Sequence, residues 1–252
     1  MDDSKRSIRF INRDALKYLA LLLMGIGHEM MFIGISHFKI LPSFVLKFFI
    51  YGMMFAPPVF FFFISEGFRY TRSRKKYALR LLIFTLITQI PYYLCSFSEE
   101  PWWNIFTHWS VLASLLAGFF ILIVWENKWK LPLRILAMIG IAGATVLIGA
   151  EWMFFGPLVI FVFYVFREKP VLRLVIFELV MLVHLFISNG FAFYLTFGGW
   201  AYFIAETIAM LVITFLYNGK KGHFPSFSKW VFYVFYPLHL LIPYLLKVFL
   251  NF

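Results

Sequence analysis

The first apolar segment of the chain contains a lysine and a histidine whose types and spacing could support proton transfer. Lys17 and His28 are separated by ten residues, and Glu29 directly follows the histidine. In a helix this spacing places the cation and the imidazole three turns, or about 16 Å, apart along the axis. Histidine takes and gives a proton near neutral pH more readily than any other side chain. We therefore expect a proton-transfer group about half a bilayer core away from a cationic group.

Four further ionisable residues lie inside later apolar segments: Glu178, His184, Glu206 and His239. Charges within a bilayer are costly and usually face a cavity, a partner or a pathway. Counted at about 1.5 Å per residue, the three histidines and Glu206 fall in the middle-to-outer half of the membrane, with Glu178 nearer the cytoplasm. This common depth predicts one polar cavity. The structural alternative for each group is a hydrogen bond to a neighbouring helix or, for the glutamates, a protonated state.

Metal binding is the second chemistry that these residue types support, and their spacing argues against it. His28 and Glu29 open an HExxH-like string, but Phe32 stands where the second histidine should be. The single cysteine, Cys95, excludes an intrachain disulfide and a thiolate zinc cluster. We expect no metal, and we expect Cys95 to be dispensable.

The elements that position these groups must be membrane helices. The 252 residues are 62% hydrophobic and 14% charged, whereas a soluble domain is about half apolar and a quarter charged. This composition predicts an all-α, polytopic transmembrane bundle, and without a visible repeat or linker we expect one domain over residues 1–252. Nine windows are long enough to span a bilayer: 15–35, 44–64, 77–97, 108–126, 132–150, 152–167, 171–188, 199–217 and 230–250.

The distribution of basic residues predicts the orientation of these helices. With the N-terminus in the cytoplasm, all 23 Lys and Arg residues except Lys39, Lys47 and Lys247 fall on inner segments, as the positive-inside rule requires. Nine helices then place the C-terminus outside. The net charge of +11 is thus mostly a topology signal, and no nucleic-acid partner is needed to explain it.

One cytoplasmic loop, from Glu66 to Arg80, is more basic than orientation requires. It includes Arg69 and Arg72, and we expect Glu66 to pair with one of them. Since Arg grips phosphate bidentately and Lys acts as a point charge, this loop is a candidate site for the phosphates of a nucleotide-type ligand. No Walker-type or GxGxxG loop is present, so no sequence motif supports an ATP site or a dinucleotide site.

Several motifs resemble those of a known family. They are ALKYLALLLMGIGH ending at His28, EGFRYTRSRKKYALRL from Glu66, NIFTHW from Asn104, EWMFFG from Glu151, YNGKKG from Tyr217 and FYVFYPLH ending at His239. Over nearly the whole chain they are similar to the TraX family, the conjugation-associated pilin acetylases and their bacterial homologues. The spacing of Lys17 and His28 also resembles a feature of the membrane acyltransferase-3 proteins.

The resemblance implies an acetyl-CoA-dependent acyltransferase in the bacterial cytoplasmic (inner) membrane. Its acceptor would be an amine or hydroxyl at the outer side: a pilin N-terminus, a peptide, a glycan or a lipid head group. Carried onto this sequence, the resemblance implies a catalytic group and a donor-binding group. The catalytic group is His28, Glu29, His239 and Asn104, and the donor-binding group is Lys17, Glu66, Arg69, Arg72, Arg80 and Lys220.

This sequence departs from the family pattern beside its first histidine. The acidic residue that usually precedes it is Gly27 here, Glu29 follows it, and the later family aspartate is Glu151. The carboxylate that supports His28 therefore stays open. So does the choice between direct attack, with Asn104, His239 or His184 stabilising the oxyanion, and a covalent acyl-histidine route.

Two readings compete with an acyltransferase. A proton-coupled transporter or channel would also use intramembrane His and Glu residues, but it has no need of a phosphate-sized cationic site. A non-catalytic partner of a pilus or cell-envelope assembly would tolerate the loss of His28.

Overall fold

The computed structural model describes residues 9–33, 41–190, 196–222 and 225–250. Within these ranges the chain is helical, with ten α-helices, and its extended backbone pairs only at two isolated bridges. Packing divides the chain into two compact units. We call Met1–Val59 together with Pro170–Phe252 the terminal unit, and Phe60–Lys169 the middle unit.

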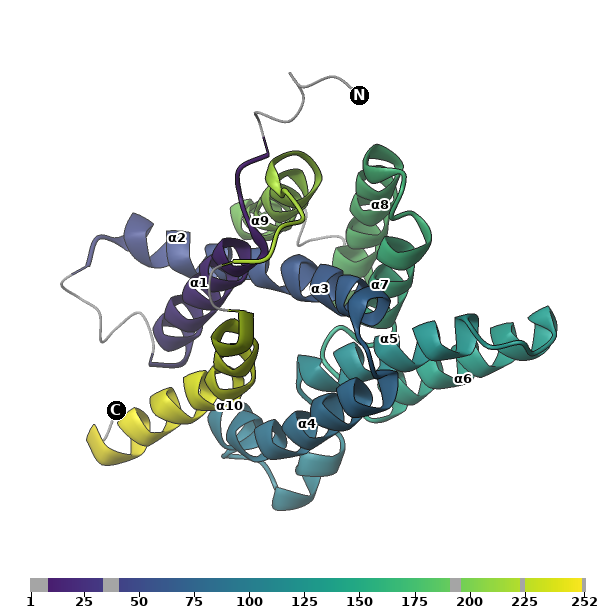
Figure 1. Cartoon of the computed structure of the whole chain (residues 1–252). Helices are drawn as coiled ribbons and strands as arrows, with labels where there is room; N and C mark the ends of the chain where they lie inside the picture. The colour runs from purple at the N-terminus through teal and green to yellow at the C-terminus, as the bar shows by residue number, and fades with distance from the viewer. Residues whose placement is uncertain (1–8, 34–40, 191–195, 223–224, 251–252) are drawn as a thin grey trace. The chain divides into compact units, whose positions relative to one another are not determined.

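The terminal unit is organised around α1 (Arg13–Ile33), which packs against both α2 (Ser43–Gly52) and α10 (Pro225–Leu250) (Figure 1). Two further helices of this unit, α8 (Pro170–Asn189) and α9 (Phe197–Leu211), pack on each other, and α9 also contacts α2. Helix α1 begins after Asn12, whose side chain accepts a hydrogen bond from the backbone N–H of Ala15 at 2.9 Å. A side-chain oxygen at this position satisfies a helix donor that otherwise has no partner.

The middle unit is organised around α5 (Val111–Trp125), whose residues are mostly buried. Three helices pack on it: α4 (Arg74–Phe97), α6 (Leu131–Leu147) and α7 (Phe155–Val165). Aromatic side chains of α3 (Ala56–Tyr70) complete this core, since Phe68 meets Phe119 at 5.2 Å and Tyr164 at 5.5 Å between ring centroids.

Six helical segments in the described part of the chain are long and apolar enough to cross a membrane: 13–32, 43–70, 74–97, 170–188, 197–216 and 230–249. The helices α5, α6 and α7 are apolar but shorter. Each of these nine segments falls on one of the nine windows read from the sequence. The expectation of an all-α, multi-pass membrane protein is therefore confirmed, whereas a single domain over residues 1–252 and the side of each terminus stay predictions. Lys39, one of the three basic exceptions, lies outside the described residues.

The loop expected between Glu66 and Arg80 is corrected by the structure. Helix α3 continues to Tyr70 and α4 begins at Arg74, so only three residues connect them. The side chain of Ser73 accepts a hydrogen bond from the backbone N–H of Lys76 at 3.3 Å and so caps α4. Hydropathy placed a loop here because the last turn of α3 and the first turn of α4 are both charged, while their backbone remains helical.

Candidate active site

The first and last helices of the chain, α1 and α10, run parallel to each other in the terminal unit (Figure 1). Near their beginnings, the hydroxyl groups of Tyr18 and Ser228 lie 2.7 Å apart. Further along both helices, His28 meets His239. Residue numbers rise in the same direction along these two contacts, so the helices are parallel. The two histidines that the sequence singles out are thus brought together.

The two histidines are joined by a direct hydrogen bond. Nδ1 of His28 lies 3.0 Å from Nε2 of His239. The ring centroids are 5.1 Å apart and the ring planes differ by 19°, so the rings meet edge to edge, as a bond between ring nitrogens requires. This contact joins residues 211 positions apart in the sequence.

The backbone around His239 defines which nitrogen carries each proton. Nδ1 of His239 lies 3.2 Å from the carbonyl oxygen of Phe235. A carbonyl can only accept, so Nδ1 of neutral His239 is the donor and its Nε2 must be the acceptor. Nδ1 of His28 therefore donates to His239, and the lone pair of neutral His28 resides on Nε2. Within the described residues no hydrogen bond to His28 Nε2 is found.

The surroundings make His28 the accessible member of the pair. His239 is only 3% exposed, and the ring of Phe235 lies parallel to it with a centroid separation of 5.2 Å. His28 is partly exposed and contacts the ring of Phe32 on its own helix. His28 is therefore the more exposed member of the pair, and His239 is enclosed by side chains of its own helix.

Two glycines on α1 allow the neighbouring helices to pack closely against it. A Cβ atom on Gly25 would lie 2.8 Å from the ring of Phe235, and one on Gly27 would lie 2.6 Å from both the Cβ of Met53 and the carbonyl oxygen of Phe49. Small residues let helix backbones pack closely within a membrane. At position 27 this packing leaves no room for a larger side chain.

The expected donor-binding lysines of the terminal unit lie at the beginning of α1. Nζ of Lys17 lies 5.8 Å from the ring centroid of Phe232 on α10. The backbone carbonyl of Lys220 accepts a hydrogen bond from the N–H of Arg13 at 2.9 Å, and the N–H of Asn218 donates to Ile11 at 2.9 Å. These bonds hold the Tyr217–Gly222 turn against the start of α1, with the Lys220 side chain exposed.

The other expected donor-binding residues belong to the middle unit. Glu66 is partly buried near the end of α3, and Arg72 is exposed in the connection to α4. Nη1 of Arg69 lies 3.5 Å from Oε1 of Glu168. The guanidinium of Arg80 lies 5.5 Å from the ring centroid of Tyr77. Of these cations Arg69 and Arg72 are exposed, whereas Arg80 is half-buried.

Asn104, the fourth expected catalytic residue, lies in a short 3-10 helix (Trp102–Phe106) of the middle unit and not at the start of α5. Its Nδ2 donates to the carboxylate of Glu100 at 2.7 Å, and its carbonyl accepts from the hydroxyl of Thr107 at 3.2 Å. The amide is therefore engaged inside its own unit by a local network.

The carboxylates of the terminal unit do not support His28 directly. Glu29 is partly exposed, and among the described residues it forms no ion pair or hydrogen bond with the histidines. Glu178 accepts a hydrogen bond from the hydroxyl of Thr207 at 2.8 Å, Glu206 is 1% exposed, and His184 is partly buried on α8. No three His, Cys, Asp or Glu side chains gather as metal ligands anywhere in the described ranges.

Glu151, in the turn between α6 and α7, binds the N-terminus of α5. Its position in the EWMFFG motif did not predict this structural role. Its carboxylate accepts a hydrogen bond from the N–H of Val111 at 2.9 Å, at the N-terminus of α5. Its own carbonyl accepts one from the hydroxyl of Ser114. The turn around it is unusual, since Trp152 and Met153 both have positive φ angles, of 65° and 37°. Burial raises the pKa of Glu151 to about 7, against the opposing effect of the hydrogen bonds from Val111 and Tyr92.

The residues that frame the histidine pair were missed from the sequence. Gly25 and Phe235 decide how closely α1 and α10 approach, and neither is chemically reactive. Two glycines spaced two residues apart inside an apolar helix, just before His28, were the available signal, because small residues mark helix–helix interfaces in membranes. Nothing in the sequence alone identified Phe235 as the partner of Gly25, or Phe49 and Met53 as the neighbours of Gly27.

Comparison with known proteins gives one result that covers both units. The model of the TraX family, described as TraX protein, matches residues 12–247. A search of curated proteins and a search of solved structures each found no match. The matched range includes both histidines and every basic residue expected to bind the donor, and it shows that this chain belongs to the TraX family.

Proposed function

We propose that this protein transfers an acetyl or other short acyl group from acyl-CoA to an amine or hydroxyl at the outer side of the bacterial cytoplasmic membrane. The observation that carries the proposal is the hydrogen bond between His28 and His239, which leaves Nε2 of the more accessible histidine free to accept a proton. Histidine in this arrangement is a general base. Membership of the TraX family supports acyl transfer as the reaction class.

The proposed reaction begins when Nε2 of His28 removes the proton from the acceptor amine or hydroxyl. The acceptor atom attacks the thioester carbonyl carbon and forms a tetrahedral oxyanion. When the C–S bond breaks, His28 returns its proton to the CoA thiolate. His239 is a positioning residue: its Nε2 holds the Nδ1 proton of His28 and shares the positive charge that develops on the imidazole.

Each unit carries a basic group that suits the phosphates of the donor. In the terminal unit, Lys17 and Lys220 lie at the beginning of α1, about 16 Å along the helix from His28. In the middle unit, Arg69, Arg72 and Arg80 lie near Glu66 at the junction of α3 and α4. We assign the primary phosphate contact to the lysines, because Lys17 shares α1 with the proposed base and the turn that holds Lys220 is bonded to the start of that helix.

The parallel arrangement of α1 and α10 supports the proposed orientation. Successive crossings alternate in direction, so two parallel helices in one membrane have an odd number of crossings between them and the total number of crossings is odd. Six long helical segments alone would make α10 antiparallel to α1. One or three of the shorter helices must therefore also cross. We propose three, with the N-terminus in the cytoplasm and the C-terminus outside.

A second candidate function, proton-coupled transport, is favoured by the carboxylates of α8 and α9. Glu206 is 1% exposed, and Glu178 is held by Thr207 at 2.8 Å. Groups of this kind are typical of proton relays. Transport would not consume acyl-CoA, so the two functions are separated by one assay.

The test is acetyl-CoA binding and thiol release by the purified protein with an added amine or hydroxyl acceptor, comparing wild type with His28→Ala. The proposal expects both proteins to bind acetyl-CoA and only wild type to release CoA. Cys95→Ser is the matched control, because it removes the protein's own thiol from the readout and should retain full activity. Absence of binding in every variant would contradict the acyltransferase and favour transport.

A further inference from the structure

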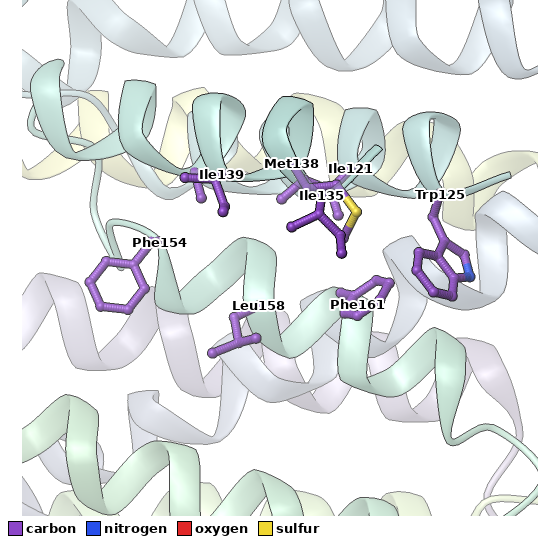
Figure 2. Close-up of a pocket in the computed structure, with 9 residues that line it drawn as sticks. Ile121, Trp125, Ile135, Met138, Ile139, Phe154, Leu158 and Phe161 are labelled. Carbon is purple, nitrogen blue, oxygen red and sulfur yellow. The ribbon is translucent and has the colours of Figure 1, made fainter. Parts of the chain in front are cut away.

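A groove in the middle unit lies apart from the histidine pair. Helices α6 and α7 each pack against α5, and a cavity of about 350 Å³ separates their facing side chains (Figure 2). This volume is within the range of small-molecule sites. Every side chain that lines it is apolar or aromatic. The groove therefore offers no hydrogen bond to a polar ligand along its length.

The shape of the groove suits a hydrocarbon chain. Ile135 and Ile139 on α6 face Leu158 and Phe161 on α7, with Phe154 at one end and Trp125 at the other (Figure 2). Ile139 is 63% exposed in the chain by itself, so the groove opens sideways along an apolar helix. In a bilayer, an opening on the side of an apolar helix borders the acyl chains of the lipid.

The Trp125 end of the groove is cationic. Nη1 of Arg134 donates to the carbonyl oxygen of Trp125 at 2.8 Å, and its guanidinium lies 5.2 Å from the Trp125 ring centroid. Lys128 and Lys130 are exposed in the preceding connection, beside the exposed ring of Trp129. Tryptophan and basic residues together are typical of the membrane–water interface.

Arg134 also has an unused donor. Its Nε is buried and has no hydrogen-bond partner in the part of the chain that the structure describes. A buried donor without an acceptor is costly. Nε and Nη2 form the edge of the guanidinium that binds phosphate bidentately, and Nη1 is already used by Trp125. Of this edge only Nε is buried, so an oxyanion at the Trp125 end of the groove can accept a hydrogen bond from Nη2.

We propose that the groove between α6 and α7 binds one acyl chain of an anionic glycerophospholipid, whose phosphate is held by Arg134. The chain fills the apolar groove and the phosphate meets the free edge of the guanidinium, while Lys128 and Lys130 attract the net negative charge of the head group. Basic residues beside a groove between membrane helices are a recurring way of holding such lipids. The site lies in the middle unit and does not depend on the proposed acyl transfer.

The experiment is native mass spectrometry of the detergent-solubilised full chain incubated with phosphatidylglycerol, phosphatidylcholine or the water-soluble head group glycerophosphoglycerol. We expect one phosphatidylglycerol to remain bound at activation energies that remove phosphatidylcholine. The head group alone should not be retained, because it has no chain to fill the groove. Equal retention of the two lipids would overturn the assignment of the phosphate to Arg134, and retention of the free head group would overturn the role of the groove.

Paired variants locate the site. Ala142→Phe fills the groove and should abolish retention, whereas Leu136→Phe, at a 65% exposed position outside the lining of the groove, should not. Arg134→Gln should reduce the preference for phosphatidylglycerol at least tenfold, and Lys128→Gln should reduce it less. Size-exclusion profiles and melting curves identify folded variants. If Ala142→Phe does not fold, Arg134→Gln decides alone, and unchanged retention in it would overturn the proposal.

Discussion

His28 donates through Nδ1 to Nε2 of His239 across 3.0 Å, and the proton on Nδ1 of His239 is directed to the backbone of its own helix. The bond orients the imidazole of His28 in the way that a carboxylate orients the histidine of a Ser-His-Asp triad. Here a second neutral imidazole takes that place. In the described part of the chain, the hydrogen-bond partner of His28 is thus His239 and not a carboxylate.

Removal of His28 and removal of His239 should lower kcat/KM to different extents. We expect His28→Ala to lower kcat/KM about 10²–10⁴-fold, the usual contribution of a general base. His239→Ala should lower kcat/KM by a smaller factor than His28→Ala, because Nε2 of His28 is still present to accept the proton. The double variant should be no worse than His28→Ala alone, since the two residues act as a unit.

The Kd for acetyl-CoA provides the control for this prediction. It should be unchanged in all three variants, because neither imidazole is expected to contact the phosphates. A positioning role for His239 would be contradicted if the free-energy losses in kcat/KM of the two single variants added up in the double variant. It would also be contradicted if the Kd for acetyl-CoA rose in the variants.

Gly25→Ala should impair activity through packing. The added methyl would approach the ring of Phe235 to 2.8 Å, which pushes α10 away and lengthens the bond between the histidines. We expect a loss of kcat of about tenfold, since small misplacements of catalytic groups are costly. Phe235→Leu in the same chain should restore part of the activity.

A matched glycine is available for comparison. A Cβ on Gly140 of α6 would meet nothing within 4 Å, so Gly140→Ala should leave the rate and the melting temperature unchanged. A similar loss in both alanine variants would mean that the effect is not specific to the interface of α1 and α10.

Lys17→Ala should weaken donor binding without changing the chemistry. Removing a cation from a phosphate contact should raise KM for acyl-CoA about tenfold and leave kcat within a factor of two. The control is Lys47→Ala, which removes the same charge from an exposed position on α2. The assay is initial thiol release against acyl-CoA concentration; a selective loss of kcat in Lys17→Ala would contradict the assignment.

Glu151 predicts a pH dependence of stability. Because burial raises its pKa from 4.5 in the unfolded chain to about 7 in the fold, the folded state holds the proton more tightly. Its contribution is complete below pH 4.5 and is lost as the pH rises to 7. Relative to Glu151→Gln, the melting temperature of wild type should fall over this interval by on the order of 5 °C.

The comparison is made with two variants in detergent. Glu151→Gln resembles the protonated state and should show no such fall, while Glu168→Gln, at an exposed carboxylate, should follow the wild-type curve. A wild-type melting temperature that rises from pH 4.5 to 7 relative to Glu151→Gln would contradict the sign of the shift.

Most of the helical architecture could be predicted from the sequence because membrane helices are a local property. Each needs only a run of apolar residues, and each of the nine windows contains a helix. The end of α3 was placed wrongly for the same reason: hydropathy responds to the charges of Arg69 and Arg74, whereas the backbone continues its hydrogen bonds to Tyr70 and restarts at Arg74.

The candidate site could be predicted only in part. His28 and His239 were identified by residue type and motif, but the proton on each nitrogen depends on the carbonyl of Phe235 and on a contact across 211 positions. Glu151 was noted as a motif residue, and its partner Val111 lies 40 positions away. Such pairings depend on tertiary packing, which has no signature in a single sequence.

The pairing of the first and last helices has a consequence for biosynthesis. The ribosome completes α1 at the beginning of synthesis and α10 at the end, so His28 enters the bilayer long before His239 exists. A nascent or truncated chain lacks the imidazole that orients the base. The histidine pair therefore forms only when insertion is finished, and an incomplete copy lacks the pair on which the proposed acyl transfer depends.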